Sequence, residues 1–111
     1  MSQHTNVPRY RKRYHLSQTE LADLVSAAQS ILSRCENSGY ILDLRTALGL
    51  QVVFGRSPRA LFPALYASVE EAVMRKAAKL DHAIRSKTDK DSKKKRELLA
   101  AMVIRSTPPA V

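Results

Sequence analysis

Residues 18–37, QTELADLVSAAQSILSRCEN, predict two short helices separated by a turn. Ser17 and Glu20 form the S-x-x-E pattern of a capping box, in which each side chain satisfies a backbone N–H at the start of a helix. Apolar residues at helical spacing continue this helix: Leu21, Leu24 and Val25. A turn at residues 26–27 then leads into a second helix over residues 28–37.

The same stretch has the residue types that a helix-turn-helix requires. Two helices locked at a fixed angle need apolar residues at set positions, a small residue where they touch, and polar residues on the outer face. The inward positions are Leu21, Ala22, Val25, Ala27, Leu32 and Cys35. Ala22 is the small residue where the helices meet. All six positions fit, so the stretch predicts a helix-turn-helix, a motif that places its second helix in the major groove of DNA.

Length and composition favour one small helical domain with an appendage. A chain of 111 residues rarely contains two independent cores, and 44% hydrophobic residues with only 5% aromatic residues indicate an aliphatic, helical core. Nineteen Lys and Arg against ten Asp and Glu give a net charge of +9. This charge favours nucleic acid as the partner, although a ribosomal or membrane-surface role would also fit it. The N-terminus lacks the apolar core of a signal peptide, and no apolar segment approaches the roughly 18 residues of a membrane span, so we expect a cytoplasmic protein without a membrane partner.

Further helices are predicted on both sides of residues 18–37, which gives an all-α chain. The first covers residues 8–14 and has a proline in its first turn. Beyond a stop signal, a helix is predicted over residues 43–54 with glycine as its C-terminal cap. The helix could instead end at Gly49, because a mid-helix glycine costs roughly 1 kcal/mol relative to alanine. A short fifth helix follows over residues 59–62.

The C-terminal half shows three patterns. Apolar residues recur every three or four positions at Leu65, Val69, Val73, Ala77, Leu80 and Ile84. They predict one long amphipathic helix, whose stripe either packs on its own domain or, as we favour, forms a dimer surface. Residues 85–96 have charged, Ser and Thr residues but no apolar residue, and predict a solvated linker. Residues 97–104, ELLAAMVI, form a short apolar tail that must pack on something or stay disordered.

Residues 9–62 resemble the Cro and lambda-repressor-like family of transcriptional regulators, also called XRE-type. The resemblance is carried by LSQTELA at 16–22, SRCEN at 33–37 and VFGRSPRALF at 53–62. It implies a five-helix DNA-binding domain in which the helix over residues 28–37 enters the major groove. With the C-terminal patterns, the expected organisation is a DNA-binding domain (7–63), a long amphipathic helix for dimerisation (64–85), and a basic linker with a short apolar tail (86–111).

The resemblance also assigns roles to individual residues. Base readout is expected from Gln29, Ser30 and Arg34, with Ser33 facing the same groove; Gln can pair bidentately with adenine and Arg with guanine. Phosphate contacts are expected from Gln18, Asn37 and Arg45. Glu36 is expected to pair with Arg11 and to brace the domain. Two departures from the family pattern are Ser26, where a glycine is usual, and residues 40–42, which lack the usual basic and proline residues.

The candidate reactive groups favour no catalytic or metal function. Cys35 occupies an inward position and is expected to be a buried, inert thiol rather than a redox sensor. His4, His15 and His82 show no metal-ligand spacing. No nucleophile elbow or phosphate-binding glycine loop is present. We therefore predict no enzyme activity, no cofactor and no metal.

The leading hypothesis is a bacterial, phage or mobile-element regulator, nucleoid-associated, that binds double-stranded DNA as a homodimer on a pseudo-palindromic operator. Repression and activation both remain open. The alternative is an antitoxin or anti-activator, in which the same domain or residues 97–104 bind a partner protein; its motivation is the apolar tail, which has no assigned contact. The basic residues 93–96 would add nonspecific attraction to DNA.

Overall fold

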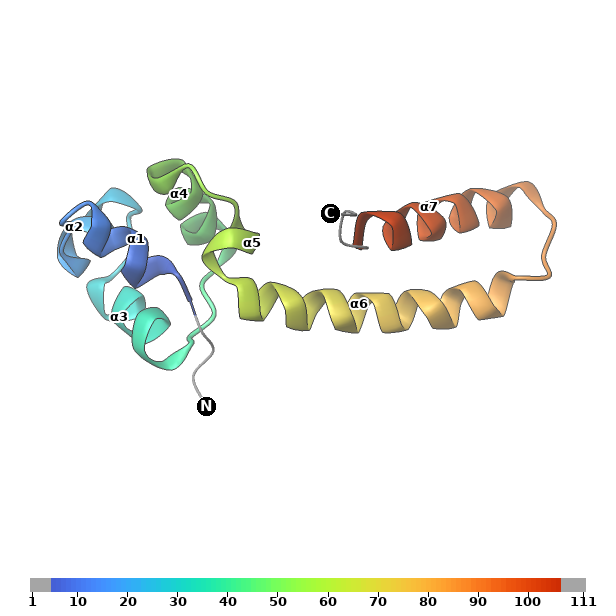
Figure 1. Ribbon diagram of the computed structural model, residues 1–111, viewed down its shortest axis with the longest axis horizontal. Helices are drawn as coiled ribbons and strands as arrows, with labels where there is room; N and C mark the ends of the chain where they lie inside the picture. The colour runs from blue at the N-terminus through green and yellow to red at the C-terminus, as the bar shows by residue number, and fades with distance from the viewer. Residues whose placement is uncertain (1–4, 107–111) are drawn as a thin grey trace, which may run out of the picture. The chain divides into compact units, whose positions relative to one another are not determined.

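The computed structural model describes residues 5–106, and every regular element in this range is an α-helix. The helices are α1 (Val7–Arg13), α2 (Gln18–Leu24), α3 (Gln29–Ser38), α4 (Leu44–Phe54), α5 (Pro58–Leu61), α6 (Pro63–Ile84) and α7 (Lys90–Ser106) (Figure 1). The predicted all-α class is confirmed. None of these helices combines the length and the apolar content needed to span a membrane. The chain divides into two compact units between Ala67 and Ser68, called unit 1 and unit 2 below.

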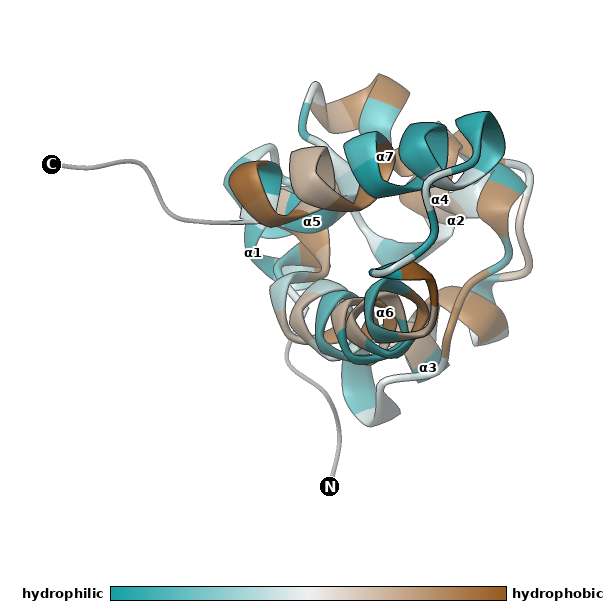
Figure 2. Ribbon diagram, turned by 90° about the vertical axis from the view of Figure 1, so that its right-hand side faces the viewer, coloured by the Kyte–Doolittle hydropathy of each residue, from teal (hydrophilic) through white to brown (hydrophobic). Residues whose placement is uncertain are grey.

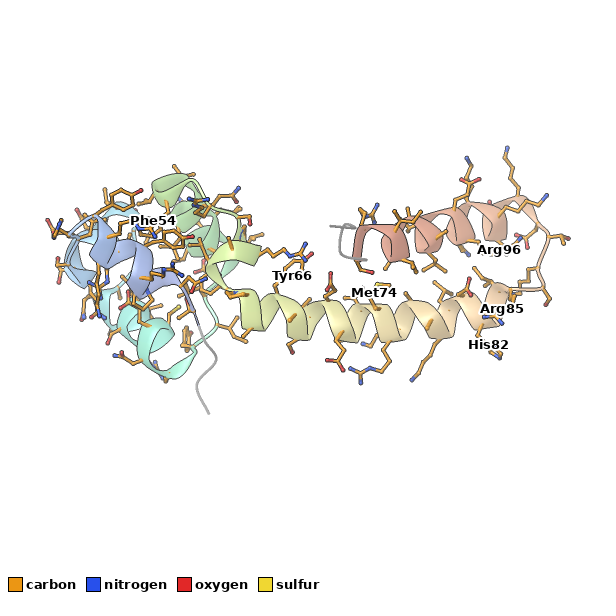
Figure 3. All side chains as sticks on the ribbon, viewed as in Figure 1. Phe54, Tyr66, Met74, His82, Arg85 and Arg96 are labelled. Atoms are coloured by element: carbon orange, nitrogen blue, oxygen red, sulfur yellow. The ribbon has the colours of Figure 1, made fainter. Side chains whose placement is uncertain are left out.

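Unit 1 has an aliphatic core to which α1 to α5 all contribute. The buried residues of this core are Val7, Leu21, Ala22, Val25, Leu32, Leu50, Phe54 and Leu61; Phe54 is labelled in Figure 3. Of the inward positions expected in residues 18–37, all are buried except Ala27, which is half-buried and packs against the core. Burial of these side chains removes apolar surface from water and fixes α2 against α3.

The helix ends in unit 1 follow local capping rules. The Ser17 hydroxyl accepts a hydrogen bond from the backbone N–H of Glu20 at 3.0 Å, and the Glu20 carboxylate accepts one from the backbone N–H of Ser17 at 2.9 Å. These hydrogen bonds to Ser17 lower the pKa of Glu20. Gly39 and Gly55 end α3 and α4 with φ values of 72° and 65°, which glycine adopts without steric cost.

Gly49 lies inside α4, which continues to Phe54. A Cβ atom at position 49 would lie 3.1 Å from Cγ1 and 3.2 Å from Cβ of Val25, tighter than ordinary van der Waals contact. Glycine therefore lets α4 pack closely against the end of α2. The close packing offsets the roughly 1 kcal/mol that a mid-helix glycine costs.

The turn between α2 and α3 has one non-glycine residue in the left-handed region, Ser26, at φ 56°. This conformation costs an L-residue roughly 1–2 kcal/mol, because Cβ approaches the backbone carbonyl. We expect Ser26→Gly to raise the free energy of unfolding by about 1 kcal/mol in urea titrations followed by circular dichroism. Ser30→Gly, inside α3, is the control and should lower it. A neutral or destabilising Ser26→Gly would show that the turn carries no strain.

Unit 2 contains α7 and α6 from Ser68 onward, and the two helices run antiparallel as a hairpin (Figure 1). The predicted long helix is confirmed, and its end-on view in Figure 2 shows both hydrophilic and hydrophobic segments. The predicted apolar stripe is covered unevenly. Ile84 is buried, Leu65 and Ala77 are half-buried, and Val69, Val73 and Leu80 are exposed.

The prediction of a linker over residues 85–96 is wrong from Lys90 onward, because α7 begins there and runs through residues 97–104. The segment is solvated as predicted, since all of its residues except Ser92 and Arg96 are exposed. Asp89 caps this helix: its carboxylate accepts hydrogen bonds from the Ser92 backbone N–H at 3.1 Å and the Ser92 hydroxyl at 2.8 Å. These bonds lower the pKa of Asp89. The lysines that follow are good helix formers, so a charge-rich composition does not exclude a helix once the start is capped.

The turn of the hairpin is closed by one side chain of α7. Arg96 donates hydrogen bonds to the carbonyl oxygens of Arg85 at 3.1 Å and Lys87 at 3.0 Å, which lie just beyond the end of α6 (Figure 3). Ile84 and Leu99 are buried close to this end. The apolar tail is part of helix α7, which continues to Ser106, while residues 107–111 lie outside the described part of the chain.

Candidate nucleic-acid interface

The helix α3 has one buried side and one polar side. Leu32 and Cys35 point into unit 1 and are 0% and 1% exposed. The side chains expected to read bases or to contact phosphate along this helix are exposed: Gln29, Ser30, Arg34 and Asn37. Ser33, also expected in the groove, is half-buried. Four of the five contact residues that the sequence predicts on α3 are therefore exposed in the structure.

A chain of side-chain hydrogen bonds connects α1, α2 and α3. Arg11 donates from Nε and from Nη2 to the two carboxylate oxygens of Glu36, both at 2.9 Å. Gln18 donates from Nε2 to Glu36 Oε1 at 3.0 Å, and Gln29 donates from Nε2 to Gln18 Oε1 at 2.7 Å. The ion pair that the resemblance implies is present. The two glutamines belong to the same network, which the sequence reasoning did not anticipate.

The ion pair at the base of this network is shielded from water. The side chains of Arg11 and Glu36 are 12% and 3% exposed. Arg11 also donates from Nη1 to the carbonyl oxygen of Leu16 at 2.9 Å, in the loop before α2. The hydrogen bond to Glu36 raises the pKa of Arg11. Because the buried charges are paired and hydrogen-bonded, they fix α3 against α1 without an unsatisfied carboxylate.

The network leaves hydrogen-bonding capacity on both glutamines. An amide side chain has two N–H donors and a carbonyl acceptor. Gln29 uses one N–H on Gln18, so its carbonyl oxygen and second N–H are open to a ligand. Gln18 uses its carbonyl and one N–H within the network, and keeps one N–H. The pair therefore presents two donors and one acceptor from the junction of α2 and α3.

Arg34 is held at the other end of α3 by the residue that follows the glycine cap. Its guanidinium carbon lies 5.1 Å from the ring centroid of Tyr40, a cation–π distance. The Tyr40 backbone N–H donates to the Arg34 carbonyl at 3.2 Å. The absence of the usual basic and proline residues from residues 40–42 does not predict this contact. The sequence feature that could have predicted the Arg34–Tyr40 contact is Gly39, because a left-handed cap turns the next residue back onto the last turn of the helix.

The remaining predicted contact residues lie outside the glutamine network. Asn37 donates from Nδ2 to the Ser33 hydroxyl at 3.1 Å, so these two side chains bind each other along α3. Arg45 is exposed at the start of α4 and forms no hydrogen bond or ion pair with the residues that the structure describes. Its charge is therefore available to a ligand.

Among the residues that the structure describes, the reactive side chains are not gathered into a second site. Cys35 is buried, and desolvation, with a smaller contribution from the Glu36 charge, raises the pKa of its thiol to about 11. His15 and His82 are exposed, and His4 lies outside the described residues. Residues 5–106 contain no group of three or more side chains placed to hold a metal ion.

Comparison with known proteins assigns no role to these residues. Protein-family models, curated proteins and solved structures all gave no significant match to the chain. A function for the polar face of α3 therefore has to be argued from its geometry and charge.

Proposed function

We propose that this protein is a sequence-specific DNA-binding regulator of transcription, in which α3 enters the major groove and the start of α2 lies on the phosphate backbone. The observation that carries the proposal is the glutamine pair Gln18–Gln29, anchored on the buried Arg11–Glu36 ion pair. The conformational freedom of side chains held by a buried anchor is lost when the protein folds and not when a ligand binds, so the anchor orients the half-buried Gln18 and the exposed Gln29 in advance.

The open groups on α3 match base edges. The carbonyl and the second N–H of Gln29 fit the N6 and N7 atoms of adenine, and Arg34 fits O6 and N7 of guanine. Ser30 is exposed beside Gln29 and can accept from or donate to either. Ser33 reads a base only if Asn37 releases its hydroxyl. The proposed readers are therefore Gln29, Ser30 and Arg34, with Ser33 in a secondary role.

The phosphate contacts are proposed for Gln18, Asn37 and Arg45. Gln18 keeps one N–H that can bind a phosphate oxygen, and Arg45 offers a charge without an internal partner. The net charge of +9 adds attraction that is independent of sequence. Because phosphate contacts release counterions, the affinity for DNA should fall steeply and log-linearly as salt is raised.

The proposed assembly is a homodimer on a pseudo-palindromic operator, with the α6 stripe as its surface. A two-fold dimer places two recognition helices on half-sites about one helical turn apart, about 34 Å. Val69, Val73 and Leu80 leave apolar surface on α6 that a second copy can cover. Two half-sites raise the affinity of a small domain that has few base contacts of its own.

Selection of bound DNA from a random pool tests this proposal. We expect an inverted repeat with A·T and G·C pairs at fixed positions of each half-site. The Gln29→Ala protein, selected in parallel, should lose the preference at one pair in each half-site. Recovery of no enriched motif by the unmodified protein would overturn the proposed function.

The alternative function, an antitoxin or anti-activator, is favoured by one observation. Three large aliphatic side chains near the end of α7 are exposed, Leu98 at 58%, Val103 at 54% and Ile104 at 74%, and apolar surface gathered on one element is typical of a protein-binding site. This function predicts a stoichiometric protein partner that is lost when residues 97–111 are deleted, while affinity for DNA is unchanged. A deletion that weakens DNA binding instead would count against it.

A further inference from the structure

Unit 2 contains more than half of the basic residues of the chain. It has eleven of the nineteen Lys and Arg residues against six Asp and Glu residues, a balance of +5. Seven of these eleven bases lie within residues 85–96, RSKTDKDSKKKR, together with only two acids. The positive charge of unit 2 is therefore concentrated at the turn of the hairpin and in the first turns of α7.

Few of the bases in residues 85–96 have a partner within the chain. Arg85 pairs with Asp81 at 3.3 Å, and Arg96 donates to two carbonyl oxygens of the turn. Lys94 Nζ lies 3.7 Å from Glu97 Oε2, but the two side chains are 72% and 69% exposed, so water screens this pair. The other four bases are exposed and form no ion pair with the residues that the structure describes: Lys87, Lys90, Lys93 and Lys95. Their positive charge is therefore available to a ligand.

Three lysines gather on one side of α7. Lys90, Lys93 and Lys94 are spaced at i, i+3 and i+4, so their side chains project from the same side of the helix. The buried Leu99 lies on the opposite side, since it follows Lys90 by two and a half helical turns. Glu97 is an acid on the same side as the lysines, and its contact is the screened pair with Lys94. We call Lys90, Lys93 and Lys94 the lysine face.

The lysine face does not serve the stability of α7. Like charges three and four residues apart repel each other, and positive charge in the first turns opposes the helix dipole, whose N-terminal end is itself positive. Glutamine favours a helix about as well as lysine and would avoid both penalties. The helix therefore contains a repulsion that its own fold does not relieve and that an anionic ligand would relieve.

The repeat of charge along the lysine face fits a DNA duplex. Side chains three or four residues apart on a helix lie about 5–6 Å from each other. Duplex DNA carries one negative charge per about 1.7 Å of its axis, so its phosphates are dense enough for each lysine to bind one. An ammonium group binds phosphate as a point charge and needs no bidentate geometry. Because both units belong to one chain, DNA bound by unit 1 also holds unit 2 at a high effective concentration beside further phosphates.

We propose that the lysine face binds the phosphate backbone of duplex DNA, on phosphates beyond those that unit 1 contacts. The affinity that unit 2 adds is then independent of sequence, whereas unit 1 supplies the base readout. This inference deepens the proposed function and rests on it for the choice of DNA as the ligand. The attraction itself is measured on DNA of scrambled sequence, so its failure and the failure of base readout are separate results.

The salt dependence of binding to a scrambled duplex, followed by fluorescence anisotropy, tests the lysine face on the full chain. The variant combines Lys90→Gln, Lys93→Gln and Lys94→Gln. Each lost phosphate contact lowers the slope of log affinity against log salt by about 0.9, so we expect the slope to fall by about 2.7. A fourfold rise in salt should then weaken the unmodified protein about 40-fold more than the variant. An unchanged slope would overturn the proposal.

The matched control removes the same charge from the other helix of the hairpin. It combines Arg75→Gln, Lys76→Gln and Lys79→Gln on α6, where the three bases are exposed and form no ion pair with the described residues. We expect the slope to change by less than about 1, because these side chains lie outside the lysine face. If the two triple variants lower the slope equally, only the net charge matters and the lysine face is not a docking surface.

Thermal unfolding followed by circular dichroism separates lost binding from lost structure. The variant of the lysine face should keep its helix content and unfold at a temperature no lower than the unmodified protein, because it loses a repulsion and no helix propensity. Weaker binding in an equally stable protein then belongs to the lost phosphate contacts. A clearly lower unfolding temperature would mean that the lysines serve the helix itself, and would contradict the proposal.

Two further outcomes identify the ligand and separate the two proposals. Tighter binding of the unmodified protein to vesicles of anionic phospholipid than to the duplex, at the same salt concentration, would make the lysine face a membrane contact and overturn its assignment to DNA. If the random pool yields no motif but the lysine variant still lowers the salt slope, base readout fails and the phosphate contact stands. A recovered motif with an unchanged slope gives the reverse result.

Discussion

We expect Arg11→Met to lower the free energy of unfolding by about 3–5 kcal/mol, a large part of the stability of so small a domain. The substitution keeps an unbranched apolar side chain but leaves the Glu36 carboxylate, 3% exposed, without its bidentate partner. The remaining donor from Gln18 is a single neutral amide. A buried carboxylate with one neutral donor is far less stable than one with a guanidinium, because desolvation is no longer offset. Urea titration followed by circular dichroism measures the loss.

The control for this prediction is the pair of variants that removes both charges. Arg11→Met combined with Glu36→Met should recover much of the lost stability, since no buried charge is left unpaired. Arg11→Lys should fall between the unmodified protein and Arg11→Met, because ammonium cannot make two parallel hydrogen bonds to one carboxylate. If Arg11→Met lowers the free energy of unfolding by less than about 1 kcal/mol, the ion pair contributes no more than a solvent-exposed pair would. Its proposed role as an anchor for the glutamines would then fail.

Local sequence rules predicted the helices of unit 1 well. The S-x-x-E box at Ser17 and the glycine caps at Gly39 and Gly55 are signals read from two to four neighbouring residues. Such signals are independent of tertiary contacts, so they appear in the sequence as clearly as in the structure. The same holds for the inward positions of residues 18–37, whose spacing follows from helix geometry.

Features that depend on distant residues were not predictable in the same way. Gly49 left the end of α4 open, and only its approach to Val25 explains a glycine at that position. On α4 the apolar Leu44 is exposed and the more polar Thr46 is buried, the opposite of what their hydrophobicity predicts. Both depend on which side of α4 meets the core, and that side is set by elements elsewhere in the chain.

The linker prediction failed for a different reason. Residues 85–96 contain no apolar residue, but this does not prevent a helix, because lysine favours helix and Asp89 is a good N-cap. The Asp89–Ser92 hydrogen bonds and the Arg96 bonds to two carbonyls hold a segment that has no core of its own. In a segment rich in charged residues, a capping residue is therefore a better predictor of a helix than the hydropathy of the segment.

Within the candidate site, the sequence identified the residues but not their connections. Gln18, Gln29 and Glu36 were assigned three separate roles, yet the structure joins them in one chain of hydrogen bonds. This changes what a substitution at position 18 should do. Gln18→Ala removes a phosphate donor and also releases Gln29. We therefore expect lower affinity for all sequences and, in addition, a weaker preference for adenine.

Arg34→Ala has the largest expected effect on DNA recognition. Loss of a bidentate contact to guanine removes about 1–3 kcal/mol of discrimination, or about 5- to 150-fold, at one base pair of each half-site. Affinity for random DNA should change much less. Binding to the selected operator and to single-base variants, measured at one fixed salt concentration by fluorescence anisotropy, gives both quantities.

Arg45→Ala is the matched control, since it removes the same charge from an exposed arginine on α4. It should weaken binding to every sequence equally and reduce the slope of log affinity against log salt by about 1. If the two variants behave alike on cognate and variant operators, Arg34 contacts phosphate and the assignment of α3 as the reading helix loses its main support.

Tyr40→Leu tests whether the tyrosine ring positions the Arg34 side chain, because it leaves Arg34 itself unchanged. The leucine keeps an apolar side chain beyond Gly39, but removes the ring that lies 5.1 Å from the guanidinium. An exposed cation–π contact contributes about 0.5–1 kcal/mol, so discrimination at the Arg34 base pair should fall by about 2- to 5-fold and no other base pair should change. In the Arg34→Ala background the same substitution should have no effect on preference. An effect of Tyr40→Leu that persists without Arg34 would mean that the tyrosine contacts DNA itself.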